Sequence, residues 1–255
     1  MHFALTKWYL DVVTDDGRVA IVYWANVQAA GLAHAVSGVL RSDGGRAESA
    51  FTLRASPAPG FDGETLHWRC DPLDIGLEAD RLEHPCFERL LETADGVLDW
   101  HGDAPRARVQ LRVGDDVLEG LGYAERLELS LAPWTLPIEM LRWGRWTSAT
   151  RSAIWIVWEG PHPLRIAFLD GVRTGDVTIH PGAVDVGGAR LTVSDDAMIT
   201  NATLGEQLGV LAPLRSLVEK VAGSRQTRWR ARGSLRGPDG RDEVGWVVHE
   251  EVAWR

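Results

Sequence analysis

Tyr123 and Glu125 stand two residues apart in the segment 120–131, which reads GLGYAERLELSL. Apolar residues alternate through this segment, which predicts a half-buried strand with its odd-numbered positions toward a core. Because both residues are odd-numbered, their side chains leave the same face of that strand, about 7 Å apart. Glu125 is therefore a carboxylate on an apolar face. Such a group needs a partner, a proton or a function, since burying an unpaired charge is costly.

General acid catalysis is the chemistry that Glu125 could perform. In an apolar cavity the pKa of a glutamate rises toward neutrality, and such an acid could protonate an unactivated alkene. Indole faces would stabilise the resulting cation, by about 2 kcal/mol when desolvated. Water or an internal nucleophile would then complete a hydration or a cyclisation, with Tyr123 orienting the acid or the attacking water. In the alternative, an arginine such as Arg142 or Arg145 pairs with Glu125 and holds it ionised, which removes it as an acid.

The segment 243–254 directs a second glutamate inward. Glu250 shares the even-numbered face of a predicted strand with apolar residues. It could line a binding site, or an arginine could pair with it, as for Glu125. The apolar residues of this face are Val244, Trp246, Val248, Val252 and Trp254.

Twelve tryptophans stand out against five phenylalanines and three tyrosines. Each indole buries about 150–250 Å² and keeps one N–H donor. Such residues can fill the interior of a barrel, or they can line a ligand cavity with rigid aromatic surface. Clustering favours the cavity for Trp134, Trp143, Trp146, Trp155 and Trp158. With Glu125 and Tyr123 as catalytic residues, we expect the substrate-binding residues to be Trp134, Arg142, Trp143, Trp146, Trp158, Trp246 and Glu250.

Strand patterns dominate the chain, and Asp-Gly pairs mark turns between them because glycine accepts a positive φ. Many short strands of this kind predict an all-β fold. They fall into two halves, predicted as domains 1–131 and 132–255. In the first strand Asp11 lies on the face opposite the apolar residues, so we expect it on the outside. The expected strands are 8–13, 19–27, 35–40, 48–54, 65–70, 107–113, 117–131, 152–158, 164–169, 176–180, 189–193, 227–235 and 243–254.

Two helices are also expected. A short one covers residues 85–93. A second covers about 203–222, because Thr203 and Glu206 have the spacing of a capping box and apolar residues follow at helical intervals. Pro213 should kink this helix and Gly223 should end it.

Composition excludes several classes of function. A net charge of −9 argues against binding nucleic acid or anionic membranes, and two cysteines are too few for a disulfide framework. No apolar stretch approaches the roughly 18 residues of a transmembrane segment, and the first residues carry no targeting pattern, so a cytoplasmic protein is expected. Nucleotide-binding loops, a G-x-S-x-G elbow and an H-E-x-x-H motif are missing from the sequence, which favours cofactor-independent chemistry or simple binding.

Four short motifs stand at the opening strand, the centre and the end of the chain: residues 7–11 (KWYLD), 122–125 (GYAE), 141–146 (LRWGRW) and 245–250 (GWVVHE). In these motifs the chain resembles the tandem lipocalin-like superfamily that includes carotenoid 1,2-hydratases (hydroxyneurosporene synthases) and AttH-like proteins. The chain departs from the family pattern after Glu125: Arg126-Leu127-Glu128 follow here, whereas Trp-Gly tends to follow in relatives. The resemblance implies two consecutive lipocalin-like β-barrels, and an activity among hydratases of isoprenoid double bonds or cyclases of polyketide-derived substrates.

Two hypotheses of function follow. In the first, the protein is a cofactor-independent enzyme that hydrates, cyclises or isomerises a hydrophobic small molecule, with Glu125 as the acid and Tyr123 as its helper. In the second, it is a non-catalytic carrier of an apolar ligand. The sequence specifies neither the substrate nor the oligomeric state.

Overall fold

The computed structural model describes residues 3–29, 32–44, 47–203, 206, 223–238 and 240–254. Strands make up most of this part of the chain, so the predicted all-β fold is confirmed. The chain forms two compact units, Met1–Leu136 (unit 1) and Pro137–Arg255 (unit 2). Two 3₁₀ turns accompany the strands, η1 (Asp71–Leu73) and η2 (Pro133–Thr135).

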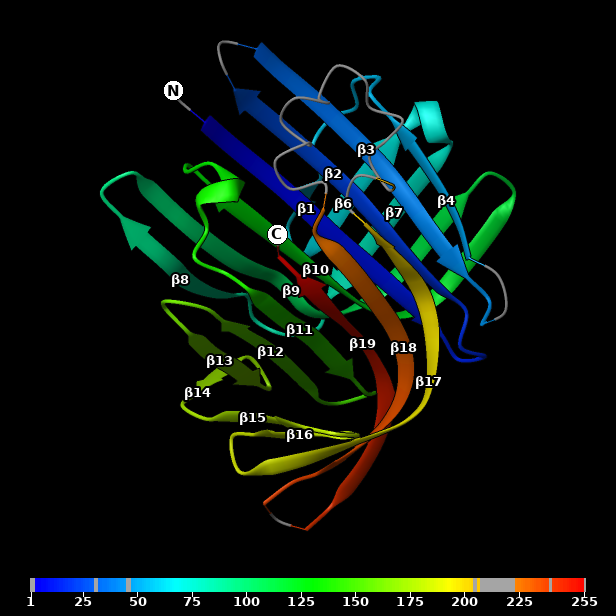
Figure 1. The fold of residues 1–255 in the computed structure, drawn as a ribbon. Coiled ribbons are helices and arrows are strands. Elements are labelled where there is room, and N and C mark those ends of the chain that lie inside the picture. Colours follow the sequence, from blue (N-terminus) through cyan, green and yellow to red (C-terminus); the bar gives the residue numbers. More distant parts are fainter. Residues whose placement is uncertain are drawn as a thin grey trace. The chain divides into compact units, whose positions relative to one another are not determined.

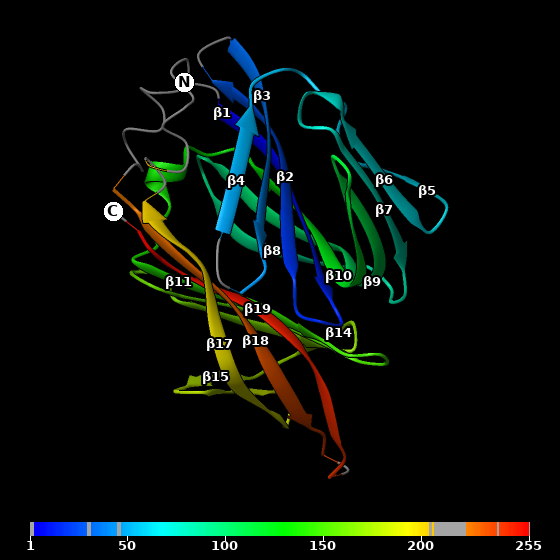
Figure 2. The same ribbon diagram turned by 90° about the vertical axis from the view of Figure 1, so that its right-hand side faces the viewer.

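Unit 1 is one ten-stranded antiparallel sheet in the order β4-β3-β2-β1-β10-β9-β7-β6-β5, with β8 paired to β9. Figure 2 shows β1 to β4 side by side. The first strand of the unit thus pairs with the last. The strands are β1 (Phe3–Thr14), β2 (Val19–Ala29), β3 (Leu32–Ser42), β4 (Ala47–Thr52), β5 (Gly60–Asp62), β6 (Thr65–Cys70), β7 (Ile75–Arg81), β8 (Cys86–Thr93), β9 (Gly96–Val113) and β10 (Asp116–Leu129).

Unit 2 repeats this topology in a nine-stranded sheet with the order β14-β13-β12-β11-β19-β18-β17-β16-β15. Its first and last strands, β11 and β19, pair as β1 and β10 do. The long strands β17, β18 and β19 lie side by side and bend strongly (Figure 1). The strands are β11 (Met140–Thr147), β12 (Ser152–Glu159), β13 (Leu164–Leu169), β14 (Val172–Thr174), β15 (Val177–His180), β16 (Ala183–Val186), β17 (Ala189–Thr203), β18 (Arg225–Arg236) and β19 (Asp242–Ala253).

Polar contacts link parts of each sheet that are far apart in strand order. In unit 2, Arg165 Nη1 of β13 donates to the Val177 carbonyl of β15, 3.5 Å away, so the sheet curves back nearly to closure. In unit 1, the indoles of Trp24 and Trp68 donate to the carbonyls of Ser56 and Pro57, at 3.1 and 3.0 Å. These two tryptophans hold the segment between β4 and β5 against strands β2 and β6. Their N–H groups therefore serve the fold.

The core of unit 1 lies on the even-numbered face of β10. Leu118 and Ala124 of this strand belong to its cluster of buried apolar side chains. The odd-numbered residues of β10 are not members of this cluster. The other buried members are Trp8, Leu10, Val12, Ala20, Val22, Trp24, Val39, Leu66, Trp68, Cys70, Ile75, Leu77, Ala79, Ala104, Ala107, Val109 and Leu111.

The odd-numbered face of β10 is also buried around Tyr123 and Glu125, as the sequence predicts. Tyr123 is 1% exposed and Glu125 is 6% exposed. The even-numbered face carries small residues because β1 passes close by: a Cβ on Gly122 would overlap the backbone carbonyl of Asp11. When both faces of a strand are buried, the alternation alone does not tell which one faces the barrel interior.

The core of unit 2 is built around Trp146 of β11 and Trp155 of β12. Gly144 leaves room for the Trp155 ring, because a Cβ at this position would overlap it. The other buried members of the cluster are Ala153, Val157, Ala167, Val177, Val184, Val186, Ala189, Leu191, Ala231, Leu235 and Val247.

The expected helix over residues 85–93 is wrong, because this segment is the strand β8. It folds back on β9 through the turn before Gly96, and Arg89 lies opposite Asp99 in the register. The two side chains form paired contacts of 2.9 and 3.2 Å, Nε to Oδ1 and Nη2 to Oδ2. Cross-strand pairing of this kind overrides a weak helical pattern.

The helix expected near 203–222 lies outside the described residues, apart from the two capping positions. There the capping box is formed: Glu206 N–H donates to Thr203 Oγ1 at 3.1 Å, and Thr203 N–H donates to Glu206 Oε2 at 2.7 Å.

Gly245 of β19 allows a test of the close contact between the first and last strands of unit 2. A Cβ here would overlap the backbone carbonyl of Thr147 on β11. We expect Gly245→Ala to lower the free energy of unfolding by about 1–3 kcal/mol, because the two strands must separate. Urea unfolding followed by tryptophan fluorescence measures this. Gly175→Ala is the control, since a Cβ there meets no atom within 4 Å and should leave stability unchanged or slightly higher. Equal stabilities would contradict the argument.

Candidate active site

Two tyrosine–carboxylate pairs lie on one face of unit 1, where β1 meets β10. Tyr9 and Asp11 are two residues apart on β1, as Tyr123 and Glu125 are on β10. The antiparallel register places Tyr9 opposite Glu125 and Asp11 opposite Tyr123. All four residues are buried. We call this group the tyrosine–carboxylate square.

Asp11 lies on the face opposite Trp8 and Leu10, as expected, but it is buried rather than solvated. Tyr9 Oη donates a hydrogen bond to Asp11 Oδ2 at 3.0 Å. The sequence contains the signal that could have found this residue. Tyr-x-Asp and Tyr-x-Glu stand on two strands that pair antiparallel, which brings each tyrosine opposite the other strand's carboxylate.

Glu125 accepts two hydrogen bonds at a single carboxylate oxygen. Tyr123 Oη donates to Oε2 at 2.7 Å, and Trp100 Nε1 donates to the same oxygen at 2.6 Å. Two donors directed at Oε2 favour a proton on Oε1 when the carboxyl group is neutral. The donors thus orient the carboxyl group.

Trp100 reaches Glu125 because β9 is irregular at this point. The register between β9 and β10 shifts twice, between Gly122 and Ala124 and again between Ala124 and Arg126. Such bulges re-aim the side chains of a strand. Gly102 completes the arrangement, because a Cβ there would overlap the Trp100 ring. Trp100 was not among the predicted site residues, because no periodic pattern in the sequence reveals a bulge of this kind.

Tyr123 stays protonated in this environment. Burial raises the pKa of its phenol well above the usual value of 10.0, and the neighbouring Glu125 carboxylate raises it further. Burial also raises the pKa of the Cys86 thiol to about 12, with the charge of Glu83 as the next cause and that of Glu125 as a smaller one. Tyr123 therefore acts as a hydrogen-bond donor, and the Cys86 thiol is not a nucleophile near neutral pH.

Glu250 occupies the equivalent position in unit 2 but has a different neighbour. It lies on the last strand opposite Trp143 of the first strand, as Glu125 lies opposite Tyr9. Arg228 of β18 forms an ion pair with it, donating from both Nε and Nη2 to Oε2. The guanidinium stabilises the ionised carboxylate. Glu250 is thus paired with an arginine, which is the alternative that the sequence left open.

The other predicted site residues do not line one surface. Trp146 lies in the core of unit 2, and its indole donates to the Gly233 carbonyl at 3.1 Å. Trp143 lies on the opposite face of the same strand. Trp134 belongs to unit 1, in η2, where its ring packs edge-on against Phe3 with centroids 5.9 Å apart.

Arg142 and Trp158 have structural contacts within unit 2. The Arg142 guanidinium pairs with Glu159 and Glu251. The Trp158 indole donates to the His162 carbonyl at 2.6 Å. Trp246, on the outer face of β19, instead lies beneath two arginines, Arg230 and Arg232.

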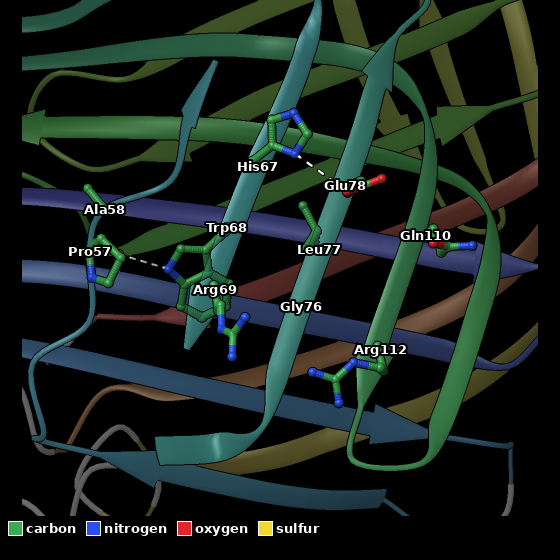
Figure 3. Close-up of a pocket in the computed structure, with 10 residues that line it drawn as sticks. All are labelled: Pro57, Ala58, His67, Trp68, Arg69, Gly76, Leu77, Glu78, Gln110 and Arg112. Atoms are coloured by element: carbon green, nitrogen blue, oxygen red, sulfur yellow. Dashed lines mark hydrogen bonds and ion pairs between the residues drawn. The ribbon is translucent and has the colours of Figure 1, made fainter. Parts of the chain in front are cut away.

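A hollow of about 530 Å³ lies elsewhere in unit 1, over the outer face of β6, β7 and β9. His67 and Glu78 form one row across it, and Arg69 and Arg112 lie on either side of Gly76 (Figure 3). Charged side chains and apolar ones such as Trp68 and Leu77 line it together, and neither Tyr123 nor Glu125 is among its lining residues. It does not match the apolar chamber expected around Glu125.

Two further observations hold for the part of the chain that the structure describes. No cluster of three or more histidine, cysteine, aspartate or glutamate side chains could hold a metal ion. Among these residues, no helical segment has the length and apolar character of a membrane span.

Comparison with known proteins identifies the fold. No family model and no curated protein matches the sequence. Among solved structures, kievitone hydratase from Nectria haematococca is 10% identical with a TM-score of 0.57, covering 98% of this chain and 88% of that one. An AttH-like protein from Nitrosomonas europaea is 10% identical with a TM-score of 0.58, covering 100% and 93%. CghA, solved with Sch210972, is 11% identical with a TM-score of 0.62, covering 98% and 88%.

These likenesses establish the class of fold: all-β, with two consecutive lipocalin-like barrels. The resemblance to AttH-like proteins predicted from the sequence is confirmed for the fold. At 10–11% identity it carries the fold alone.

Proposed function

We propose that this protein is a cofactor-independent enzyme that hydrates, cyclises or isomerises a hydrophobic small molecule of isoprenoid or polyketide type. The observation that carries the proposal is the buried Glu125, whose Oε2 accepts hydrogen bonds from Tyr123 and Trp100. This geometry supports general acid catalysis by a carboxyl group whose proton is on Oε1. A positioned acid of this kind contributes about 10²–10⁴-fold to a rate.

The reaction begins when Glu125 Oε1 transfers its proton to one carbon of an alkene, which leaves a carbocation at the other carbon. In a hydration, water adds to the cation and then returns a proton to the Glu125 carboxylate. In a cyclisation, a second alkene of the substrate adds to the cation, and the new cation then loses a proton from an adjacent C–H bond to the carboxylate. In an isomerisation, the first cation loses a proton from an adjacent C–H bond directly to the carboxylate. Each route regenerates the acid, so no other reactant is needed. Tyr123 and Trp100 stabilise the carboxylate that forms when the proton leaves.

The comparisons add support of a coarser kind. One structural neighbour is named a hydratase, and another was solved with a small molecule, Sch210972. Both share the two-barrel fold along nearly the whole chain. An enzyme acting on a hydrophobic small molecule is therefore compatible with what is known of proteins of this fold.

A substrate screen tests the proposal directly. Purified protein is incubated with a panel of acyclic terpenoids, linear polyenes and polyketide-derived alkenes, and products are separated by liquid chromatography with mass detection. A hydratase adds the mass of one water, and a cyclase or isomerase gives a product of unchanged mass with a new retention time. Quenching of tryptophan fluorescence by a compound that is never converted would favour the carrier. No quenching and no conversion across the panel would contradict both.

Tyr123→Phe tests whether Tyr123 positions the acid. Removing a donor to the ionised carboxylate raises the pKa of Glu125. Because the proposed acid must be protonated, activity is lost as pH rises through that pKa. We therefore expect the variant to have a kcat about tenfold lower, with the alkaline limb of its kcat–pH profile moved to higher pH. An unchanged limb would show that the phenol has no effect on the acid, even if kcat fell.

A further inference from the structure

Two arginines on β18 lie over one tryptophan of β19. Arg230 and Arg232 flank the core residue Ala231, so both side chains leave the outer face of the sheet. Trp246 lies opposite Arg232 in the register. The Arg232 guanidinium carbon is 3.7 Å from the centroid of the Trp246 ring, and that of Arg230 is 4.9 Å from it. Two guanidinium groups thus lie over a single indole ring.

Neither cation is neutralised within the part of the chain that the structure describes. Arg230 and Arg232 form no hydrogen bond or ion pair there, although two other arginines on the same face of β18 do. Arg228 pairs with Glu250, and Arg236 forms paired contacts of 2.8 Å with Asp242. Every other arginine of this face thus has a carboxylate, and the pair over Trp246 does not.

The two guanidinium groups repel each other. Burial lowers the pKa of Arg230, and the charge of Arg232 lowers it further, while Asp195 opposes this shift without forming an ion pair. The indole face offsets part of the repulsion, since a cation over a tryptophan gains about 0.5–1 kcal/mol at an exposed site. A bound anion would attract both groups and offset the remaining repulsion.

We propose that Arg230, Arg232 and Trp246 form a binding site for the phosphate or diphosphate group of a small molecule. A guanidinium offers two parallel N–H donors that match the oxygens of a phosphate group. Two guanidinium groups provide a charge of +2, which suits a phosphate monoester with about −1.5 to −2 at neutral pH. Since the protein carries a net charge of −9, such a site is not part of a generally basic surface.

The neighbouring surface favours a phosphorylated molecule that also has an apolar part. Val244 stands two residues before Trp246 on the same face of β19 and is 62% exposed. An apolar substituent next to the phosphate group can cover this side chain. The site belongs to unit 2 and does not depend on whether Glu125 is an acid.

Titration calorimetry with inorganic diphosphate at constant ionic strength tests the proposal. We expect saturable binding by the unaltered protein, and affinities at least tenfold weaker for Arg230→Gln and for Arg232→Gln. Arg232→Lys keeps the charge but loses the paired donors, so it should weaken binding several-fold. Arg236→Gln is the matched control, because it removes the same charge from the same face of the strand. Its affinity should stay within twofold.

The remaining outcomes overturn the proposal. The absence of saturable binding excludes the site. If Arg236→Gln weakens diphosphate binding as much as Arg230→Gln does, the anion is attracted only by the overall positive charge of this face. A second arm uses phosphatidylcholine vesicles with and without phosphatidic acid. Binding to the anionic vesicles alone, with none to free diphosphate, assigns the arginines to a membrane surface rather than to a small molecule. Circular dichroism of each variant shows whether a loss of binding follows from unfolding.

Discussion

Glu125→Gln is expected to lower kcat by at least about 100-fold and to leave the Kd for substrate within twofold. Glutamine has nearly the same shape and can still accept the hydrogen bonds from Tyr123 and Trp100 through its amide oxygen. It has no acidic proton to transfer, however. The measurement is the single-turnover rate with the substrate found in the screen, combined with fluorescence titration of binding. A carrier would show the same Kd for both proteins and no turnover for either.

Glu119→Gln is the matched control for this prediction. Glu119 is on the same strand, is exposed, and accepts a hydrogen bond from Gln110 at 2.6 Å. The substitution removes the same charge from β10 and should leave kcat unchanged. If Glu125→Gln retained full activity, or if both variants lost activity equally, the acid at position 125 would be excluded.

The alternation of residues in a strand predicted which side chains are buried. It did not predict which face of the strand points into the barrel interior. The segment 120–131 was expected to be a strand with the side chains of Tyr123 and Glu125 on a buried face, and both expectations are confirmed. The barrel interior nevertheless lies on the other face, where Gly122 and Ala124 give no apolar signal. Gly122 is required by the close approach of β1, and that approach is a property of the pairing rather than of either strand.

Contacts that depend on pairing were the ones that sequence reasoning missed. Trp100 reaches Glu125 through two register shifts, and Asp11 lies beside Tyr123 because of the β1–β10 register. Neighbours in the sequence were likewise a poor guide for the tryptophans. Trp143 and Trp146 are three residues apart and therefore leave opposite faces of β11, so a cluster in the sequence does not make a cluster in space.

The equivalent glutamates of the two units show how one position in a fold can serve two purposes. Both stand on the last strand opposite the first, and the neighbouring strand determines what each contacts. Strand β9 brings the neutral donor Trp100 to Glu125, whereas β18 brings the cation of Arg228 to Glu250. Neutral donors leave a carboxyl group able to exchange its proton, while an arginine favours the ionised form. The proposal for Glu125 therefore rests on unit 1, where two neutral donors contact the carboxyl group, and Glu250 is paired with a cation in unit 2.

Glu250→Leu is expected to lower the free energy of unfolding by about 3–5 kcal/mol. The Arg228 side chain is 2% exposed and that of Glu250 is 12% exposed, so the substitution leaves a buried guanidinium without the carboxylate that it now pairs with. Burying a charge without its partner is costly because water no longer solvates it. Urea unfolding followed by tryptophan fluorescence and circular dichroism measures the loss.

Two comparisons separate the burial of charge from the loss of a contact. The double variant Arg228→Met with Glu250→Leu replaces both charges by apolar groups and should recover most of the lost stability, because no buried charge remains. Asp242→Ala breaks the pair with Arg236 on the same strand, where the side chains are 67% and 45% exposed. An exposed pair contributes about 0–1 kcal/mol, so this variant should be nearly as stable as the unaltered protein. If the double variant were as unstable as Glu250→Leu alone, packing around Glu250 rather than the charge of Arg228 would account for the loss.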